Sequence, residues 1–433
     1  MSYTTTQFLP FDRDTVWTYH TRLGAVARLT PPFLPMTPVR QAASLADGTT
    51  VFALPAGLKW IARHDITAYR RGRQFADDCV SAPIKALAHW RHVHRFEDAP
   101  GGTELTDVVD TRVPRAALRA SFAYRQRQLL GDLTSAARIN PTAITVGITG
   151  SRGLVGRALT AFLSTLGVEV VQLTRERAKP GQRLWNPTSP DPQLLDGLNA
   201  VIHLAGEPIL GRFSDSHKKA LRDSRIEPTK KLAELVSTSP TCHTFISASA
   251  IGYYGPKCGT DEPVDVHAGP GEGFLADVVA DWEAAATTCT KRTVLMRTGM
   301  VLSGRGGALP VFKALFSTGL GGSLGTGEQW MSWVSIDDLV DAYAAALFND
   351  SSGPVNAVSP HPVRNSEFAE LLSKELRRPA LVNIPSIGPK LLLGKEGATE
   401  FALADQRVAT SLRDLRHPHL AQALGHELGG DHA

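Results

Sequence analysis

Hydrophobic and polar residues alternate in short runs over the first 110 residues of the chain. Alternation with a period of two predicts β-strands that are buried on one face. It is seen in TTVFAL (49–54), KWIARHDITAY (59–69), HWRHVHRFED (89–98) and, after a Gly-Gly turn, GGTELTDVVDTRVP (101–114). Helical spacing follows over Arg115–Arg138, with Leu118, Phe122, Leu129, Leu130 and Leu133 on one side. Strands followed by one long helix predict a curved sheet wrapped around that helix.

A different pattern runs from Ile144 to Arg175, where an apolar run is followed by three glycines and an amphipathic segment. Gly150 permits a tight turn, Gly153 lets backbone N–H groups approach a pyrophosphate, and Gly156 lets the next helix pack closely on the strand. The helix carries its apolar stripe at Val155, Leu159, Phe162 and Leu166. Its N-terminus offers unpaired N–H groups to phosphates. Because a second apolar run follows, the order strand, turn, helix and strand predicts a dinucleotide-binding Rossmann-type unit.

The end of the second predicted strand, Val168–Thr174, indicates which dinucleotide is preferred. NAD-binding sites usually have Asp or Glu there for the ribose 2′-hydroxyl. This strand ends in Thr174-Arg175, and a guanidinium suits a 2′-phosphate. We therefore expect NADP(H), the alternative being that Arg175 is a surface arginine.

The position of the glycine turn also divides the chain. A Rossmann-type unit usually opens its domain, and Asn140-Pro141 interrupts regular structure just before it. We expect one domain over 1–140 and a second over 143–433, with 359–433 contributing to a substrate lobe. The predicted fold class is a doubly wound α/β parallel sheet preceded by an α+β domain.

Composition narrows the functional classes only slightly. With 42% hydrophobic and 20% charged residues the chain is typical of a globular protein, and a net charge of +4 over 433 residues is too dilute to indicate nucleic-acid binding. The four cysteines, Cys79, Cys242, Cys258 and Cys289, lack metal-ligand spacing, which favours free thiols in a reducing compartment. Without a signal-peptide pattern or a run of about 18 apolar residues, we expect a cytoplasmic protein that does not enter a membrane. The oligomeric state is left open.

Part of the first domain resembles the START-like, or polyketide-cyclase-like, helix-grip family. The resemblance rests on Trp17, Pro31-Pro32, GLKWIARH, FADDCVSAPIKALAHWRHVHRF and FAYRQRQLLGDL. It implies a cavity between sheet and helix that holds an apolar ligand. His92 and His94 would share one face of a strand beside Trp90. Since no third ligand is evident, we expect cavity-lining or structural histidines and no metal site.

Three later segments are expected to surround the cofactor and substrate. One apolar strand runs into Leu204-Ala205-Gly206, where small residues let the backbone pass the cofactor, and another ends within Phe245–Gly255. Eight glycines lie between Gly304 and Gly327; such a segment folds tightly round a ligand or forms a mobile lid. The residues that close it, Gln329, Trp330 and Trp333, are expected to face the cleft, with packing in the lobe core as the alternative for the tryptophans.

From residue 144 onward the chain resembles the atypical extended short-chain dehydrogenase/reductases called epimerase family proteins, or nucleoside-diphosphate-sugar epimerase-like proteins. The matching segments are TGSRGLVG, LTR, VIHLAGEPI, DSRIEPT, SASAIGYYG, DWEAAA, RTGMVLSGRGGAL, GLGGSLGTGEQWMSWVSIDDL, GPVNAVSPHPVRNSEFA and RRPALVNIPS. The resemblance implies cofactor contacts at Gly150, Ser151, Gly153, Leu154, Val155, Thr174, Arg175, Leu204, Ala205 and Arg225, and we add Arg152, Gly156 and Gly206 from the same segments. For Arg225, an exposed helix arginine is the alternative.

The usual proton relay of this fold is expected to be missing. Short-chain dehydrogenases use Ser, Tyr and Lys, with Tyr-x-x-x-Lys on one helix face so that the lysine lowers the tyrosine pKa. Ser247 or Ser249 can supply the serine, but Phe274 and Val278 occupy the aligned pair. We therefore expect a site that lacks the Tyr-x-x-x-Lys pair, and we expect no such spacing elsewhere in the chain. Substitutes for its proton donor are Tyr253 or Tyr254 with Ser249, or the more distant Glu283, and Ser249 with Tyr253 is the preferred assignment.

Three classes of function remain open. The first is an NADP(H)-dependent oxidoreductase or epimerase acting on an unidentified small molecule. The second is an NADP(H)-binding sensor or regulator with little or no turnover. The third is a scaffold in which the START-like domain carries the biological role.

Overall fold

The computed structural model describes residues 2–259, 261–319, 321–379, 383–385 and 387–430. It divides into two compact units, one formed by Met1–Pro141 with Ala161–Gly167 and the other by Thr142–Thr160 with Val168–Ala433. Among the described residues, no helix is long and apolar enough to cross a membrane. All four cysteines are free, as expected.

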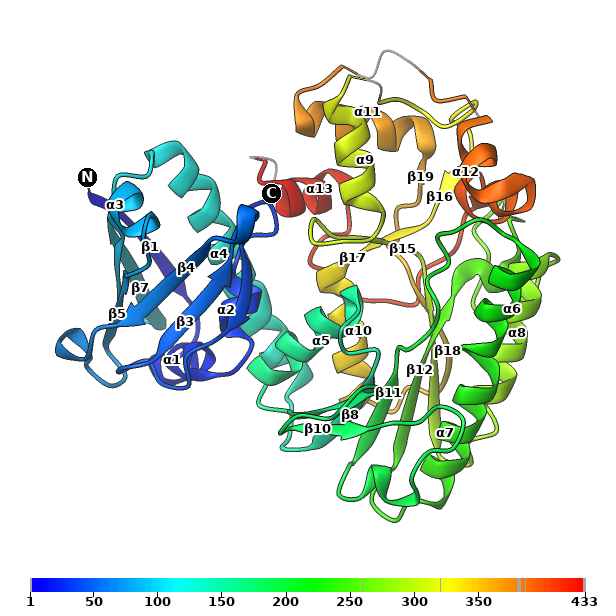
Figure 1. Ribbon diagram of the computed structural model, residues 1–433, viewed down its shortest axis with the longest axis horizontal. Helices are drawn as coiled ribbons and strands as arrows, with labels where there is room; N and C mark the ends of the chain where they lie inside the picture. Colours follow the sequence, from blue (N-terminus) through cyan, green and yellow to red (C-terminus); the bar gives the residue numbers. More distant parts are fainter. Residues whose placement is uncertain (1, 260, 320, 380–382, 386, 431–433) are drawn as a thin grey trace. The chain divides into compact units, whose positions relative to one another are not determined.

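The first unit contains a seven-stranded antiparallel sheet in the order β1-β7-β6-β5-β4-β3-β2 (Figure 1). Its strands are β1 Ser2–Leu9, β2 Thr37–Arg40, β3 Thr49–Ala53, β4 Lys59–His64, β5 Gln74–Cys79, β6 Arg91–Ala99 and β7 Gly102–Asp110. Its helices are α1 Arg13–Thr21, α2 Ala25–Leu29, α3 Ile84–Ala88 and α4 Arg115–Ile139, with short 3-10 turns at Pro55–Gly57 and Ile66–Ala68. The long helix and the predicted strands are present, but the strand predicted over residues 59–69 ends at His64 and is followed by a 3-10 turn.

Helix α4 packs on one face of this sheet. Leu129 and Leu133 of the helix share a buried cluster with Trp17, Phe75 and Phe96, in which the rings of Phe75 and Phe96 lie 5.9 and 5.2 Å from that of Trp17. An antiparallel sheet with a long helix is what a helix-grip fold requires. Other α+β folds share this arrangement, so the START-like assignment stays a prediction.

The second unit is built on a seven-stranded parallel sheet in the order β10-β9-β8-β11-β12-β14-β18. Its strands are β8 Thr145–Thr149, β9 Glu169–Thr174, β10 Gln182–Leu184, β11 Ala200–His203, β12 Thr244–Ala250, β14 Arg292–Thr298 and β18 Gly353–Ala357. The order reverses direction at β8, the first strand, as in Rossmann folds. The predicted Rossmann-type sheet is therefore confirmed.

Helices cover both faces of the parallel sheet (Figure 1). One face carries α7 Ile226–Thr238 and α8 Phe274–Ala286, and the other carries α5 Leu154–Thr165 and α10 Ile336–Phe348. Apolar side chains of β9, β11 and β12 pack with those of α7 in one buried cluster. This packing fixes the positions of the carboxyl ends of the strands, which is where ligands bind in this fold.

The substrate side is made from smaller elements. They are a 3-10 turn Pro192–Leu195, α6 Asp215–Asp223, a 3-10 turn Ile251–Tyr254, β13 Lys257–Cys258, β15 Met300–Leu302, α9 Ala308–Ser317, β16 Trp330–Met331, β17 Trp333–Ser335, β19 Val363–Arg364, α11 Asn365–Leu376, α12 Ile387–Gly397, a π-helical turn Ala398–Ala402, β20 Asp405–Gln406 and α13 Leu420–Leu428. β13 pairs with β20, and Gln406 Nε2 donates to the carbonyl oxygen of Gly255 (2.6 Å). A late segment of the chain thus supports the turn that follows β12.

Candidate functional site

The glycine turn after β8 has backbone contacts that only glycine allows. Gly150 has φ +64°, and a Cβ on it would lie 2.7 Å from the carbonyl carbon of Leu204. A Cβ on Gly156 would lie 2.3 Å from the carbonyl oxygen of Gly150, whereas a Cβ on Gly153 would meet only that oxygen, at 3.2 Å. Gly150 and Gly156 are therefore required by packing, and Gly153 leaves an open approach to the turn.

A threonine that sequence reasoning missed joins the two cofactor segments. Thr149 is fully buried, and its Oγ1 accepts the backbone N–H groups of Leu204 (3.1 Å) and Ala205 (3.2 Å). The same oxygen lies 2.7 Å from His203 Nδ1. Burial lowers the pKa of His203 to about 3, so the imidazole is neutral and shares a hydrogen bond with the threonine hydroxyl. A hydroxyl at the end of the first strand was the available signal.

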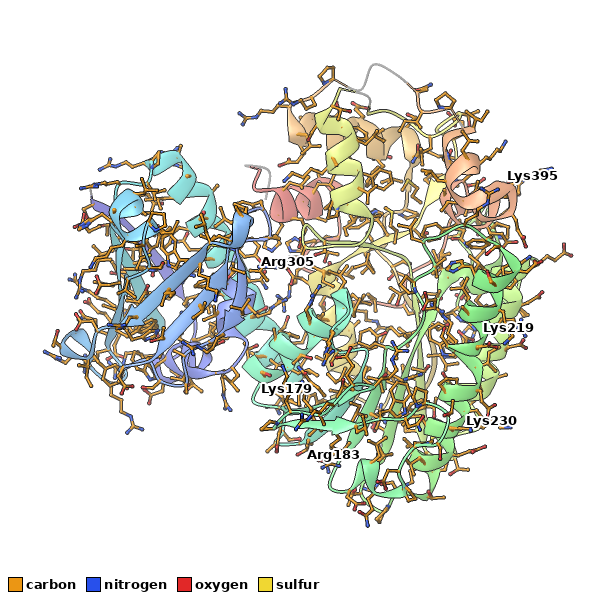
Figure 2. The ribbon with its side chains drawn as sticks, viewed as in Figure 1. Lys179, Arg183, Lys219, Lys230, Arg305 and Lys395 are labelled. Carbon is orange, nitrogen blue, oxygen red and sulfur yellow. The ribbon has the colours of Figure 1, made fainter. Side chains whose placement is uncertain are left out.

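The edge of the sheet beside the turn is basic and exposed. Arg175 follows the buried end of β9 and is exposed. The next residue, Glu176, pairs with Arg152, whose hydrogen bond and charge lower the Glu176 pKa. A cleft of about 620 Å³ is lined by Arg152, Glu176, Arg177, Ala178, Lys179 and Gln182, and Lys179 lies along this edge (Figure 2). The carboxylate of Glu176, which follows the end of β9, is thus paired with Arg152.

Arg225 is buried and does not lie on an exposed helix face. Its guanidinium donates to the carbonyl oxygen of Glu207 (2.8 Å) and lies 5.2 Å from the ring centroid of Trp282. A Cβ on Gly206 would lie 3.1 Å from the guanidinium carbon. Burial lowers the Arg225 pKa to about 10, which leaves it charged at neutral pH. Arg225 therefore supports the segment that follows β11 through its contacts with Gly206 and Glu207.

The predicted catalytic serine belongs to a buried network. Ser249 Oγ donates to Glu283 Oε1 (2.5 Å), and Arg297 binds both carboxylate oxygens of Glu283 at 2.8 and 2.7 Å. Arg297 Nη1 also donates to the Tyr254 hydroxyl (2.8 Å), which donates to Asn356 Oδ1 (2.7 Å). Burial would lower the pKa of Arg297, but Glu283 outweighs burial and raises it. Ser249 and Tyr254 are thus held by protein partners.

Tyr253 differs from its neighbour. Its side chain is partly exposed, and the Arg297 guanidinium carbon lies 3.6 Å from its ring centroid. Among the described residues, its hydroxyl has no hydrogen-bond partner. Of the serine and tyrosines proposed for proton transfer, Tyr253 is the one whose hydroxyl is available.

The expectation that the chain lacks a Tyr-x-x-x-Lys spacing is wrong, because Tyr253 and Lys257 have it. The intervening backbone is a 3-10 turn followed by Gly255 at φ +79° and then β13. Since the residues are not on a helix, the spacing does not place them on one face. Phe274 and Val278, the residues aligned with the usual Tyr and Lys, lie on α8. The pair on one helix face is therefore absent at this position.

One expectation about the substrate side is corrected. Trp333 does not face a cleft: it is fully buried in the lobe core, and its Nε1 donates to the carbonyl oxygen of His361 (3.0 Å). Trp330 is partly exposed between the guanidinium groups of Arg364 and Arg407. The glycine-rich segment is not one continuous loop, because α9 occupies its middle; the described part of the segment leaves out residue 320.

The first unit contains a cavity of about 420 Å³. His92 and His94 lie in its wall, as expected, and Asp77 on the neighbouring strand is the third group that sequence reasoning missed. One nitrogen of each imidazole and one oxygen of Asp77 lie within 4.8 Å of one another, a composition that can hold a metal ion. However, Asp107 Oδ1 already lies 2.8 Å from His92 Nε2 and 2.8 Å from His94 Nδ1.

The charges in this cluster are set by Asp107. Its contact with His94 Nδ1 is an ion pair without hydrogen-bond geometry. Burial would raise the pKa of Asp107, but His94 and His92 outweigh burial and hold it well below its usual range. Burial would lower the pKa of His94, but Asp107 and Asp77 raise it. The pKa of His92 falls to about 4, mainly through burial.

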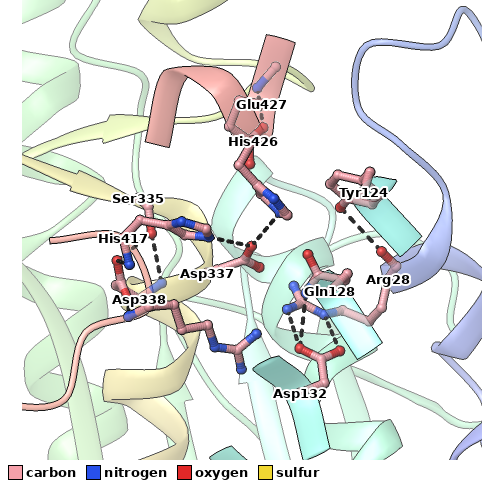
Figure 3. A network of polar contacts seen from close by, with 12 residues as sticks. Arg28, Tyr124, Gln128, Asp132, Ser335, Asp337, Asp338, His417, His426 and Glu427 are labelled. Atoms are coloured by element: carbon pink, nitrogen blue, oxygen red, sulfur yellow. Dashed lines mark hydrogen bonds and ion pairs between the residues drawn. The ribbon is translucent and has the colours of Figure 1, made fainter. Parts of the chain in front are cut away.

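A second buried cluster lies in the second unit (Figure 3). Asp337 Oδ2 lies 3.2 Å from His426 Nε2 and 3.8 Å from His417 Nε2, and these three residues also have metal-ligand composition. Nearby Glu427 accepts the backbone N–H of Gly304 (2.5 Å). Burial, with the charge of Asp337, raises the pKa of Glu427 to about 7.

Together, the doubly wound sheet and the glycine turn define the second unit as a nucleotide-binding Rossmann protein of the extended dehydrogenase type. Residues 146–358 match the NAD dependent epimerase/dehydratase family. An epimerase family protein of Mycobacterium bovis is 40% identical over 294 residues, covering 65% of this chain and 96% of that protein. A chloroplastic homologue from Arabidopsis thaliana is 37% identical over 284 residues, covering 61% of this chain and 80% of that protein. The chain belongs to the epimerase family.

Two solved structures extend the comparison. A nucleoside-diphosphate sugar epimerase from Corynebacterium glutamicum is 49% identical with a TM-score of 0.87, covering 99% of this chain and 90% of that chain. Human epimerase family protein SDR39U1, solved with NADPH, is 29% identical with a TM-score of 0.60, covering 66% of this chain and 99% of that chain. The fold and nucleotide-binding class of the second unit are thereby shown.

Proposed function

We propose that the second unit binds NADP(H) and acts as an epimerase or oxidoreductase on a small molecule through an atypical site. The observation that carries the proposal is the glycine turn, in which a Cβ at Gly150 or Gly156 would collide with backbone. Such a turn brings the N-terminus of α5 close to where a pyrophosphate would bind, although the Gly153 N–H already donates to the carbonyl oxygen of Gly150 (2.9 Å). When bound, the nicotinamide would supply the hydride chemistry.

The preference for NADP(H) is supported by the charges beside the turn. Arg175 is exposed at the strand end, and the neighbouring acid, Glu176, is paired with Arg152. A 2′-phosphate would therefore find an arginine and meet a carboxylate that is already neutralised. The human relative solved with NADPH supports the same choice.

The proton chemistry is assigned to Tyr253. Its hydroxyl is available, and its ring lies against the Arg297 guanidinium. Ser249 binds Glu283, so in this arrangement it does not serve the tyrosine. Turnover of ordinary short-chain dehydrogenase substrates is therefore expected to be slow.

The buried network around Ser249 and Tyr254 favours a second candidate function. Because Ser249 and Tyr254 are held in a buried network, the second unit is also suited to bind NADP(H) as a sensor with little or no turnover. The two candidates are distinguished by whether bound NADPH is oxidised when carbonyl substrates are supplied.

The cofactor proposal is tested by thermal shifts with NADPH and NADH. NADPH at about 100 times its dissociation constant should add about 2.7 kcal/mol of stability. Arg175→Ala should weaken NADPH binding roughly 10- to 100-fold and leave NADH binding unchanged. Lys230→Ala, at an exposed position of α7 (Figure 2), is the control. Equal shifts from both nucleotides, or an unchanged preference in Arg175→Ala, would contradict the NADP(H) assignment.

We also infer that the first unit holds an apolar small molecule in its cavity. Most of the wall consists of apolar and aromatic side chains, and about 420 Å³ falls within the volume range of ligand pockets. An apolar fluorescent probe added to the full chain should bind there. Weaker binding in Leu118→Trp, which fills the cavity, would locate the probe, and unchanged binding would contradict the inference.

A further inference from the structure

One side chain in the first-unit cavity does not match its surroundings. The face of α4 that lines the cavity carries Leu118, Phe122 and Arg125, at helical spacings of four and three. Leu129, the next residue on this face, belongs to the apolar core. Arg125 therefore occupies a position where the helix pattern calls for an apolar residue.

The Arg125 guanidinium has little to compensate its charge. Its Nη1 reaches only the carbonyl oxygen of Leu29, at 3.5 Å, and its Nε is buried without a hydrogen bond. The guanidinium carbon lies 5.6 Å from the ring centroid of Phe122. Within the described part of the chain, no carboxylate pairs with Arg125. Arg125 is partly exposed, so water offsets part of the cost of a cation that lies in apolar surroundings without an anion.

The acids nearest to the cavity are already engaged. Asp107 lies 2.8 Å from both His92 and His94, and Asp77 lies 3.9 Å from His94 Nε2. His20, which also lines the cavity, donates through Nδ1 to the carbonyl oxygen of Val16 (2.8 Å). Burial lowers its pKa to about 3, and the charge of Arg125 contributes. None of these groups supplies the missing negative charge.

We propose that the first unit binds an amphipathic monocarboxylate, with its carboxylate on Arg125 and its hydrocarbon body against the apolar wall. This inference rests on the proposed ligand cavity and adds the chemical class of the ligand. A carboxylate can accept two N–H bonds from one guanidinium, and Arg125 is among the residues that line the cavity. Trp60, Phe52 and Leu54 supply apolar contacts in the same cavity.

The experiment compares an acid with a matched alcohol by titration calorimetry on the full chain. Decanoate and decan-1-ol share a hydrocarbon body and differ in the charged head. The wild type should bind decanoate roughly 10-fold or more tightly than decan-1-ol. Arg125→Met should remove that preference and leave decan-1-ol binding unchanged, and Arg125→Lys should restore part of it. Arg119→Met, at an exposed position of the same helix, is the control and should behave as the wild type.

Each contrary result has a distinct meaning. Equal binding of acid and alcohol to the wild type would overturn the carboxylate proposal and leave the apolar cavity standing. Binding of neither would overturn both. An acid preference that persists in Arg125→Met would show that another group holds the head, and a preference abolished by EDTA would assign the head to a metal ion at Asp77, His92 and His94 instead. If Arg125→Met does not fold, binding of decanoate and decan-1-ol to the wild type, with and without EDTA, still shows whether the cavity prefers a carboxylate and whether a metal ion holds it.

Discussion

The two adjacent tyrosines after β12 allow a direct test of the buried network. Tyr254 is only 4% exposed. Tyr254→Phe removes its hydroxyl, which is hydrogen-bonded to both Arg297 and Asn356. Asn356 Oδ1 would lose its donor, while Arg297 Nη1 would keep the carbonyl oxygen of Val266 (3.0 Å). A buried polar group left without a partner costs about 1–3 kcal/mol. With one group fully and one partly unsatisfied, we expect a loss of roughly 2–3 kcal/mol.

Tyr253→Phe removes a hydroxyl that has no partner among the described residues, so its cost should stay within about 0.5 kcal/mol. Urea unfolding followed by circular dichroism measures both variants against the wild type. At a slope of about 3 kcal/mol per molar urea, the transition of the second unit in Tyr254→Phe should fall by roughly 0.7–1 M. Equal losses in the two variants, or a larger loss in Tyr253→Phe, would refute the assignment of the free hydroxyl.

Three further predictions test the glycine turn, the raised pKa of Glu427 and the role of Tyr253 in proton transfer. Gly156→Ala, whose Cβ would lie 2.3 Å from a carbonyl oxygen, should abolish NADPH binding and destabilise the second unit, whereas Gly153→Ala should fold normally and bind NADPH more weakly; normal folding of both would contradict the packing argument. The raised pKa of Glu427, about 7 against 4.5, contributes stability below pH 4.5 that is lost as pH rises through 7. Relative to Glu427→Gln, the free energy of unfolding of the wild type should therefore fall by about 3 kcal/mol between pH 4 and 8.5, and parallel titration curves in urea would disprove it. If a substrate is found, Tyr253→Phe should slow turnover roughly 10²- to 10⁴-fold with unchanged NADPH affinity, and unchanged turnover would remove Tyr253 as the acid.

The features that could be predicted from the sequence are those set by local chemistry. The alternation of β4 and β6 and the glycine spacing at 150, 153 and 156 depend on backbone geometry within a few residues. Both were recovered in the structure. The position of Arg175 after β9 follows from the same local order.

The features that could not be predicted depend on distant partners. Ser249 is held by Glu283, 34 residues away, and Tyr254 by Asn356, 102 residues away. Trp333 follows a glycine-rich segment, yet the lobe core buries it. Asp77 reaches the histidine pair only because β5 pairs with β6. A periodic pattern gives the face of a residue within its own element, but it does not say which element covers that face.

The pairing of β13 with β20 has a consequence for the order in which this protein is made. Gln406 supports the turn after β12 through the carbonyl oxygen of Gly255, 151 residues earlier. The chain is made in sequence order, so the segments of the glycine turn and of the parallel sheet leave the ribosome before residue 406 does. A nascent chain therefore passes through a stage in which the segments of the parallel sheet have been made while β13, which follows the turn carrying Tyr253, still lacks its partner strand β20. The contacts that β20 and Gln406 make beside this turn can form only after the last of these segments has been made.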